Sequence, residues 1–390
     1  MKIKQKPEDF QVHEINDFAP SETGDFFVYS LEKRGLSTIE CLRILQRKYR
    51  LKSEDLQVCG LKDKHSMSSQ LISSKRKLSE DTNNNQFTLE LIGKSDDRIG
   101  EKNHKGNEFI ITVRDVSVAE IELAEKTIDK LKKFGLINYF DDQRFGSVRH
   151  GNEFIAKCLI EKKYEKACKI FMTATSSADR SRDRRRRKDI DANWNDFAML
   201  DKKYGYCEEK PLLHHLKKNP EDWLGALLKI NHHLRFILLY SYQSFIWNKT
   251  TSIYLQKLGI ADLSTEYLLG SLNFYDSPDS SVFATIQNLE IPIIRHSTTI
   301  ENEDLRRIYE DVLDEEGLTI QKFRIRSHPA FYFKEYQRKL VVVPENLEII
   351  DAGSDDLNKN KQFLTLKFNL IPGAYATLIL KRIFKTKINS

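Results

Sequence analysis

The sequence predicts an α+β protein in which a sheet built from both ends of the chain is interrupted by a mainly helical insertion. Segments near both ends alternate apolar and polar residues with the period of two that is typical of strands. The middle of the chain is mainly helical in pattern. A length of 390 residues exceeds what one hydrophobic core usually serves, which favours two domains or a large insertion.

The strand patterns come first in this prediction. Residues 26–32 and 86–92 alternate in the strand period, and residues 107–113 are rich in β-forming side chains. Near the other end, the alternating apolar residues are Leu364, Leu366, Phe368 and Leu370. A terminal strand must bury its apolar face somewhere, so we expect the strands from both ends to share one sheet.

Helices are expected beside these strands. Ser37 or Thr38 caps the first helix, and its apolar face consists of Ile39, Leu42 and Leu45. A second helix covers residues 118–134, with Gly135 placed to end it. A third helix, over residues 374–384, follows the last strand.

The middle of the chain, residues 154–325, is expected to form an inserted helical domain. Residues 1–153 and 326–390 then form the domain that carries the sheet. Within the insertion, residues 181–188 (SRDRRRRK) concentrate positive charge that attracts phosphates by counterion release. A solvated helix face is the alternative explanation of this run.

The composition is that of a globular protein with a heavily charged surface, because 40% of the residues are hydrophobic and 31% are charged. Lysine and arginine outnumber aspartate and glutamate by 63 to 57, which gives a formal net charge of +6. This excess suits a polyanionic partner without requiring one.

Neither secretion nor a membrane span is expected. Residues 1–10 contain no apolar signal segment, and the longest apolar stretch, residues 236–247, is interrupted by polar side chains. The five cysteines form no CxxC pair and no metal-type spacing, so neither a disulfide framework nor a zinc site is expected. The cytoplasm fits these features best.

Residues 60–65 (GLKDKH) form the densest polar segment that follows a strand-like lead. Glycine permits a tight turn that presents the next side chains outward. Asp63 lies between Lys62 and Lys64, whose charges favour its ionised form, and an ionised carboxylate can act as a nucleophile or a base. Taken alone, this triplet is more often an ordinary charged turn.

Residues 138–146 (NYFDDQRFG) mix aromatic rings with an amide, a glutamine and an arginine just after a predicted helix. Such a mixture is suited to stacking a nucleobase and to holding its edge or phosphate. The candidate substrate-binding residues are Asn138, Phe140, Gln143 and Arg144. The aromatic residues of this segment are equally compatible with a place in the core.

Together with residues 4–14 (KQKPEDFQVHE), these two segments resemble the ordered motifs of TruD-type pseudouridine synthases. Three long motifs in the same order rarely coincide by chance. Further segments resemble the family at residues 105–114, 241–248 and 370–377. The resemblance spans nearly the whole chain and is weakest between residues 154 and 235.

The resemblance implies a pseudouridine synthase catalytic domain, a mixed and mainly antiparallel sheet with flanking helices, interrupted by a helical domain peculiar to TruD proteins. Asp63 matches the family's essential aspartate, Lys4 the basic residue that pairs with it, and Phe140 the aromatic that stacks on the target base. Asn138 matches an asparagine near that base, and Glu14 a motif acid to which we assign a structural role. Lys62 and Lys64 flank the aspartate as further candidate substrate-binding residues.

Two departures from the family pattern concern the rim of the site. Asp141 stands where a glycine is common, and residues 66–70 (SMSSQ) replace a more usual Ala-x-Thr pattern. Neither departure removes a catalytic group, so we expect RNA preference to change more than chemistry.

The activity implied by the resemblance is isomerisation of a uridine in tRNA, expected at position 13, to pseudouridine. The reaction is redox-neutral and the sequence has no phosphate-cradling glycine loop or metal cluster, so no cofactor is expected. No protein partner is implied. If Lys4 serves Asp63, the extreme N-terminus must be packed rather than frayed.

Two other functions remain open at this point. A non-catalytic RNA-binding or tRNA-folding protein would use the basic run and the aromatic segment. An intact aspartate segment argues against it, because a pure binding module gains nothing from an anion where RNA approaches. Metal-dependent hydrolysis through His214 and His215 or His232 and His233 has little support, because adjacent histidines on a helix point in different directions.

Overall fold

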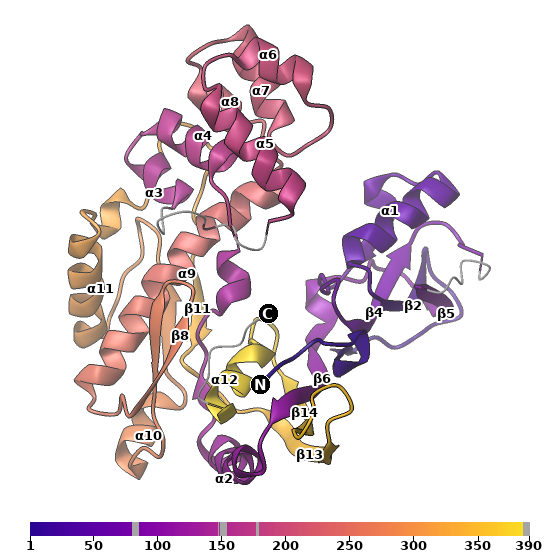
Figure 1. The fold of residues 1–390 in the computed structure, drawn as a ribbon, viewed down its shortest axis with the longest axis vertical. Coiled ribbons are helices and arrows are strands. Elements are labelled where there is room, and N and C mark those ends of the chain that lie inside the picture. Colours follow the sequence, from indigo (N-terminus) through magenta and orange to yellow (C-terminus); the bar gives the residue numbers. More distant parts are fainter. Residues whose placement is uncertain (80–85, 147, 149–153, 177–178, 385–390) are drawn as a thin grey trace. The chain divides into compact units, whose positions relative to one another are not determined.

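The fold is described from a computed structural model, and it covers residues 1–79, 86–146, 148, 154–176 and 179–384. The chain divides into two compact units (Figure 1). Unit 1 comprises Met1–Asn138, Asp276–Gln287 and Val341–Ser390, and unit 2 comprises Tyr139–Tyr275 and Asn288–Leu340. Among the helices within the described residues, none has both the length and the apolar character needed to cross a membrane.

Unit 1 is built on an eight-stranded sheet in the order β13-β14-β6-β1-β4-β2-β5, with β3 paired to β4. Strands β1 and β4 are parallel, and the other pairs are antiparallel. The strands are β1 (Phe10–Asn16), β2 (Phe26–Arg34), β3 (Leu56–Val58), β4 (Met67–Ser74), β5 (Phe87–Ser95), β6 (His104–Val116), β13 (Glu345–Ser354) and β14 (Gln362–Leu370).

Strand β14 joins the end of the chain to its beginning by pairing with β6, as the sequence predicted. Leu364, Leu366, Phe368 and Leu370 are all buried. The ring of Phe368 stacks on that of Phe109 in β6, with 5.5 Å between the ring centroids. This aromatic pair buries the face that an isolated strand would have left without a partner.

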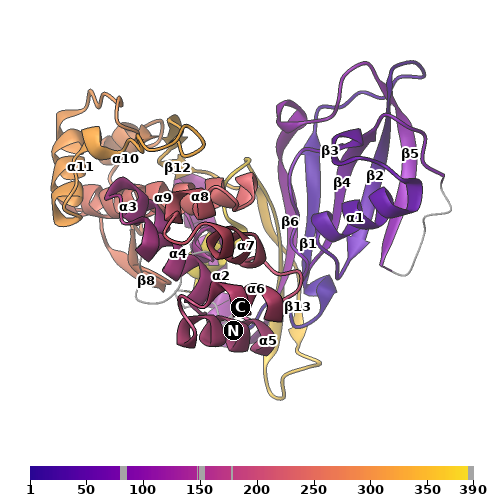
Figure 2. The same ribbon diagram turned by 90° about the horizontal axis from the view of Figure 1, so that it is seen from above.

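Helix α1 (Thr38–Tyr49) covers one face of strands β2, β4 and β5 (Figure 2). Ser37 caps it by accepting a hydrogen bond from the Glu40 N–H, as predicted. Its buried face consists of Thr38, Cys41 and Leu45. The prediction for Ile39 was wrong, since that side chain is 44% exposed and turned away from the sheet.

Helix α2 (Val118–Phe134) has the predicted bounds and ends at Gly135. A glycine is required there because its φ is +64° and a Cβ atom would lie 2.6 Å from the Val342 carbonyl oxygen. Two further helices of unit 1 are α10 (Ser280–Ile286) and α12 (Ala376–Phe384), and β7 (Leu136–Ile137) pairs with β12 (Val341–Val342).

Unit 2 is mainly helical. Its helices are α3 (Ile155–Ile160), α4 (Tyr164–Thr173), α5 (Ser181–Ala192), α6 (Phe197–Lys203), α7 (Lys210–Lys218), α8 (Trp223–Leu227), α9 (His232–Lys257) and α11 (Glu303–Glu315). Two short sheets were not predicted and pair β8 (Leu263–Tyr267) with β9 (Gly270–Phe274) and β10 (Glu290–Ile293) with β11 (Tyr336–Lys339).

The boundaries of unit 2 differ from the predicted insertion, residues 154–325. The pairing of β10 with β11 holds residues 336–339 in unit 2. Helix α10 belongs to unit 1, where the Phe283 ring packs edge-on against that of Phe134 at 5.3 Å, and Asp276 forms ion pairs with Lys130 and Arg382. These long-range contacts have no signature in local sequence periodicity.

Candidate active site

Asp63 lies in unit 1, in the loop between β3 and β4, with its side chain 54% exposed. The loop backbone is held from the adjacent helix and strand. The Lys62 N–H donates to Thr38 Oγ1 at 2.9 Å, and the Gln70 amide donates to the Gly60 carbonyl at 2.9 Å. Thr38 Oγ1 in turn donates to Gln70 Oε1 at 2.7 Å, so the start of α1 and strand β4 hold the loop together.

Lys33, at the end of β2, fixes the backbone of Asp63 itself. Its ammonium donates to the Asp63 carbonyl oxygen at 2.6 Å, and Ser66 Oγ donates to the same oxygen at 2.9 Å. Burial lowers the pKa of Lys33 to about 8, since the low-polarity surroundings disfavour its charged form. Because these two hydrogen bonds hold the Asp63 backbone, they also fix the position from which its side chain extends to the surface.

The ammonium of Lys62 points inward, away from any substrate in solution. It donates to Asn107 Oδ1 and lies 3.6 Å from Glu14 Oε2. The side chain of Lys62 is 6% exposed and that of Glu14 is 0% exposed. Burial lowers the pKa of Lys62. Instead of lining the substrate side as expected, Lys62 anchors the loop to β1 and β6.

Lys4 brings the N-terminal segment to the aspartate. Its Nζ lies 3.5 Å from Asp63 Oδ2 and 4.3 Å from the centroid of the Phe10 ring. Lys4 adopts the left-handed region, with φ of 59°, which few residues other than glycine occupy. Lys64, the other lysine flanking Asp63, pairs instead with Glu40 at 2.9 Å.

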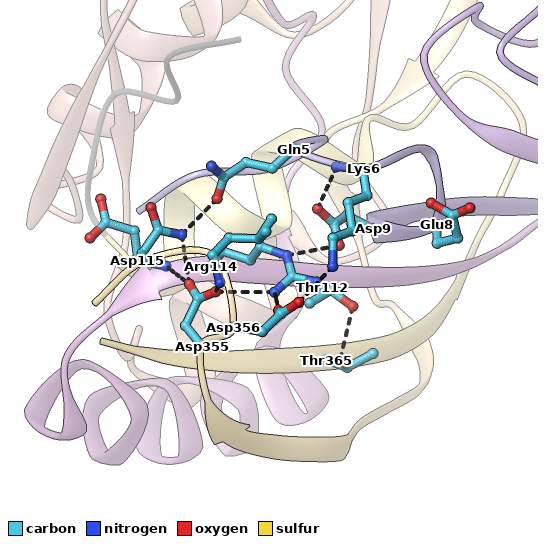
Figure 3. Close-up of polar contacts among 12 residues, drawn as sticks. Gln5, Lys6, Glu8, Asp9, Thr112, Arg114, Asp115, Asp355, Asp356 and Thr365 are labelled. Atoms are coloured by element: carbon cyan, nitrogen blue, oxygen red, sulfur yellow. Dashed lines mark hydrogen bonds and ion pairs between the residues drawn. The ribbon is translucent and has the colours of Figure 1, made fainter. Parts of the chain in front are cut away.

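The N-terminus is packed, as a pairing between Lys4 and Asp63 requires. The backbone of Lys2 exchanges two hydrogen bonds of 2.8 Å with that of Arg114. The Arg114 guanidinium, at the centre of Figure 3, bonds Asp9 at 2.9 Å, Asp355 at 3.1 Å and Asp356 at 2.6 Å. One buried cation therefore ties the first residues of the chain to the segment between β13 and β14.

Phe140 lies in unit 2, two residues after Asn138, a buried residue that ends the first segment of unit 1. The Phe140 backbone is clamped by Asn248 of α9, whose Oδ1 accepts from the Phe140 N–H at 2.9 Å and whose amide donates to the Phe140 carbonyl at 2.8 Å. The ring is buried, with the Arg338 guanidinium carbon 3.9 Å from its centroid.

The residues after Phe140 form a short 3-10 helix, η4 (Asp142–Phe145). Gln143 is exposed on it, and the Arg144 guanidinium carbon lies 5.2 Å from the Phe140 ring centroid. Asp141, the departure from the family pattern, is buried at the start of this helix, where its carbonyl accepts from the Arg144 N–H at 2.8 Å.

The family model for tRNA pseudouridine synthase D (TruD) matches residues 1–383 of this chain. The chain belongs to the TruD family. A Methanocaldococcus jannaschii protein named probable tRNA pseudouridine synthase D 2 is 35% identical, over 99% of this chain and 93% of its own length. The tRNA pseudouridine synthase D of Aquifex aeolicus is 28% identical, over 100% of both chains.

A solved structure gives the same result for the fold. The putative TruD of Methanosarcina mazei superposes with a TM-score of 0.72 at 26% identity, over 98% of this chain and 93% of that chain. The predicted TruD membership and the predicted fold class are thereby confirmed, including the mixed, mainly antiparallel sheet. Proteins of the TruD family are isomerases.

Sequence reasoning missed several residues around the TruD motifs. Lys33, Thr38 and Gln70 hold the aspartate loop, and Arg338 lies on the Phe140 ring. Lys33, Thr38 and Arg338 lie outside the motif segments. Gln70 is the last residue of segment 66–70, one of the two departures from the TruD pattern. Asn248 lies in the helical segment that resembles the family, but its contacts with the Phe140 backbone were not predicted.

The paired histidines do not gather into a metal site. His214 faces Asp201 at 3.5 Å, and His215 faces Asp222 at 2.7 Å. Across the described ranges, no three or more histidine, cysteine or acidic side chains come together as metal ligands would.

Proposed function

We propose that this chain isomerises a uridine of tRNA, expected at position 13, to pseudouridine, with Asp63 as the catalytic carboxylate. The observation that carries the proposal is the surface carboxylate of Asp63, paired with the Lys4 ammonium at 3.5 Å while buried Lys33 holds its backbone at 2.6 Å. An ordinary charged turn has no need of a buried lysine and an ordered N-terminus to fix one aspartate.

The reaction breaks the bond between C1′ and N1, turns the uracil, and joins C1′ to C5. The C5 hydrogen leaves as a proton and N1 gains one, so the overall change is an isomerisation. In one route Asp63 attacks C1′ as N1 leaves and forms a ribosyl ester, which C5 then displaces. In the other route Asp63 removes the C2′ proton as N1 leaves, which gives a glycal-like intermediate, and the proton returns to C2′ when C5 bonds to C1′. Both routes need the aspartate in its anionic form.

The target nucleotide has to leave its stack before reaction, and we assign Phe140 to receive the base. Stacking on an aromatic ring is worth about 1 to 3 kcal/mol per base, which offsets part of the unstacking cost. Because Arg338 covers the ring at 3.9 Å, its guanidinium has to move when the base arrives. Asn138, Gln143, Arg144 and Lys64 are the further residues proposed to hold RNA, and Lys62 is assigned a positioning role.

The reaction assigned to this chain uses RNA alone and no cofactor, and it takes place in the cytoplasm. The similar proteins are named tRNA pseudouridine synthases, and these names support tRNA as the substrate of this chain.

Mapping of pseudouridine in small RNA tests the proposal directly. RNA from cells with the protein should carry a pseudouridine that is absent without it, and an Asp63→Asn variant should fold and bind tRNA but form no product. Asp97→Asn is the matched control, because Asp97 is also an exposed aspartate paired with a lysine, Lys102 at 2.6 Å. Full turnover by Asp63→Asn would remove the aspartate from the mechanism, and binding without product by the wild type would favour the non-catalytic RNA-binding function.

A further inference from the structure

The basic run of α5 divides into two groups of arginines. The guanidinium groups of Arg186 and Arg187 both turn to Glu209, whose side chain is 0% exposed, at 2.9 and 2.8 Å. Arg187 also donates to the carbonyl oxygens of Phe171 at 2.8 Å and Ala174 at 3.1 Å. These two arginines form structural contacts within unit 2.

Other arginines of the run remain available. The Arg182 side chain is 79% exposed and lies 3.9 Å from Asp183, a carboxylate that Arg186 already holds at 2.6 Å. Arg185 forms no hydrogen bond or ion pair with the residues that the structure describes. Residues 182, 185 and 186 lie on one face of α5, because positions three and four apart in a helix are neighbours.

This face of α5 forms one wall of a cavity of about 510 Å³. The other wall is the end of α6 and the connection to α7, with Lys203, Tyr204 and Tyr206. A cavity of this volume is in the size range that holds small organic ligands.

Asp189 joins the two walls. Both of its carboxylate oxygens accept from the Lys203 ammonium at 2.8 Å, and Oδ2 also accepts from the Tyr204 hydroxyl at 2.5 Å. These hydrogen bonds lower the pKa of Asp189, which therefore stays ionised at neutral pH. Because Lys203 neutralises the one acidic residue of the lining, Arg182 and Arg185 leave the cavity with an excess of positive charge.

Tyr206 stands at this cavity with its side chain 100% exposed. A fully exposed aromatic ring next to the exposed guanidinium groups of Arg182 and Arg185 combines the two elements that bind single-stranded nucleic acid. These elements are a stacking surface for a base and cations for the backbone. A phosphopeptide or an acidic protein surface would use the arginines but would leave the ring without a planar partner.

We propose that this cavity, which we name the α5 pocket (Arg182, Arg185, Arg186, Lys203, Tyr204 and Tyr206), binds RNA through two backbone phosphates, one on Arg182 and one on Arg185, and through an unpaired base on Tyr206. The inference rests on the proposed function for the identity of the polymer. It assigns unit 2 direct contacts with the RNA substrate.

The test measures binding of an unmodified tRNA transcript by fluorescence anisotropy over a range of salt concentrations. The Arg182→Gln, Arg185→Gln double variant should weaken binding by about tenfold and reduce the slope of log K against log salt by about 1.4, which corresponds to two single-strand phosphate contacts. Tyr206→Ala should weaken binding by about tenfold with the slope unchanged, while Tyr206→Phe keeps the wild-type affinity.

The matched control is the Arg184→Gln, Lys188→Gln double variant, which removes the same charge from the same helix at positions outside the pocket. If both double variants change the affinity and slope equally, the pocket assignment is overturned. Competition by free uridine monophosphate at micromolar concentration would overturn it as well, by making the cavity a nucleotide site. Single-turnover rates at saturating tRNA should be unchanged in this control variant.

The two proposals fail separately. If the wild type makes pseudouridine but binds tRNA no more tightly than the Arg182→Gln, Arg185→Gln double variant does, only the α5 pocket proposal is wrong. If the wild type makes no pseudouridine but the pocket variants lose tRNA affinity as expected, only the proposed enzymatic function is wrong.

Discussion

The central carbon of the Arg338 guanidinium lies over the Phe140 ring, 3.9 Å from the ring centroid. The same guanidinium donates to the Tyr139 carbonyl at 3.2 Å, and the Trp247 ring meets the Phe140 ring edge-on at 5.7 Å. A planar cation on an aromatic face occupies the kind of position that a stacked base takes. The Phe140 ring is therefore buried beneath Arg338.

Replacing Phe140 should distinguish a role of its ring in stacking on the base from a role in packing of the core. Phe140→Leu keeps an apolar side chain but loses the aromatic face, so the single-turnover rate at saturating RNA should fall by about tenfold or more. Phe145→Leu is the control, because Phe145 is also buried in the same segment and packs edge-on against Tyr267 at 5.7 Å. Equal losses of rate in the two variants would show that Phe140 acts only through folding.

Lys4→Met should lower turnover more than RNA affinity. Methionine keeps an apolar stem beside Phe10 but removes the ammonium that lies 3.5 Å from Asp63. Because a poorly placed catalytic group costs up to about a hundredfold in rate, the single-turnover rate should fall by about ten- to a hundredfold while the dissociation constant changes little. A variant that binds tRNA weakly but reacts at the wild-type rate when saturated would make Lys4 a phosphate contact instead.

Lys33→Met should change how stability depends on pH. In the wild type the pKa of Lys33 is about 8 because of burial, below its ordinary value of 10.5. Below pH 8 both folded and unfolded chains bind this proton, so the cost of burying the ammonium is fully present. Between about pH 8 and 10.5 the unfolded chain binds more protons than the folded one, so the wild type gains stability as the pH rises.

Urea denaturation of both proteins at pH 7 and pH 9.5 measures this gain. The wild type should become more stable relative to Lys33→Met by on the order of 1 kcal/mol across that interval. Burial raises the pKa of the neighbouring Cys41 thiol to about 11, above this window. A constant difference between the two proteins would mean that Lys33 keeps an ordinary pKa in the fold.

Arg114→Met should destabilise the protein and disable the candidate site together. The change leaves Asp9 and Asp355 as buried carboxylates without their cation, with side chains 2% and 0% exposed. Breaking a buried ion pair in this way costs about 3 to 5 kcal/mol. The N-terminal segment also loses the contacts that hold it, so turnover should fall beyond the loss of folded protein, as judged by circular dichroism and single-turnover rates on the same samples.

Arg307→Met is the control for that experiment, because Arg307 and Glu303 form an exposed pair on α11, with side chains 64% and 61% exposed. Exposed pairs contribute about 0 to 1 kcal/mol. An Arg114→Met variant as stable as this control would contradict the role given to the Arg114 cluster.

The sequence by itself determined the elements of unit 1 and the motif residues of the site. Alternation in β2, β5 and β14, the caps of α1 and α2 and the glycine after α2 are local signals, and each element formed where these signals placed it. Asp63, Lys4 and Phe140 became candidates because they belong to contiguous segments that resemble TruD motifs, within the range that the family model matches. These features depend on residues a few positions apart in the chain.

Only the tertiary structure decided which side chains face solvent and which face the core. Lys62 and Lys64 are both neighbours of Asp63 in sequence, yet one is buried against Glu14 and Asn107 while the other pairs with Glu40. Arg185 and Arg186 diverge in the same way, since only Arg186 meets Glu209. The partner that fixes each direction lies 23 to 48 positions away along the chain, so the choice depends on how β1, α1 and α7 pack, which local sequence patterns do not record.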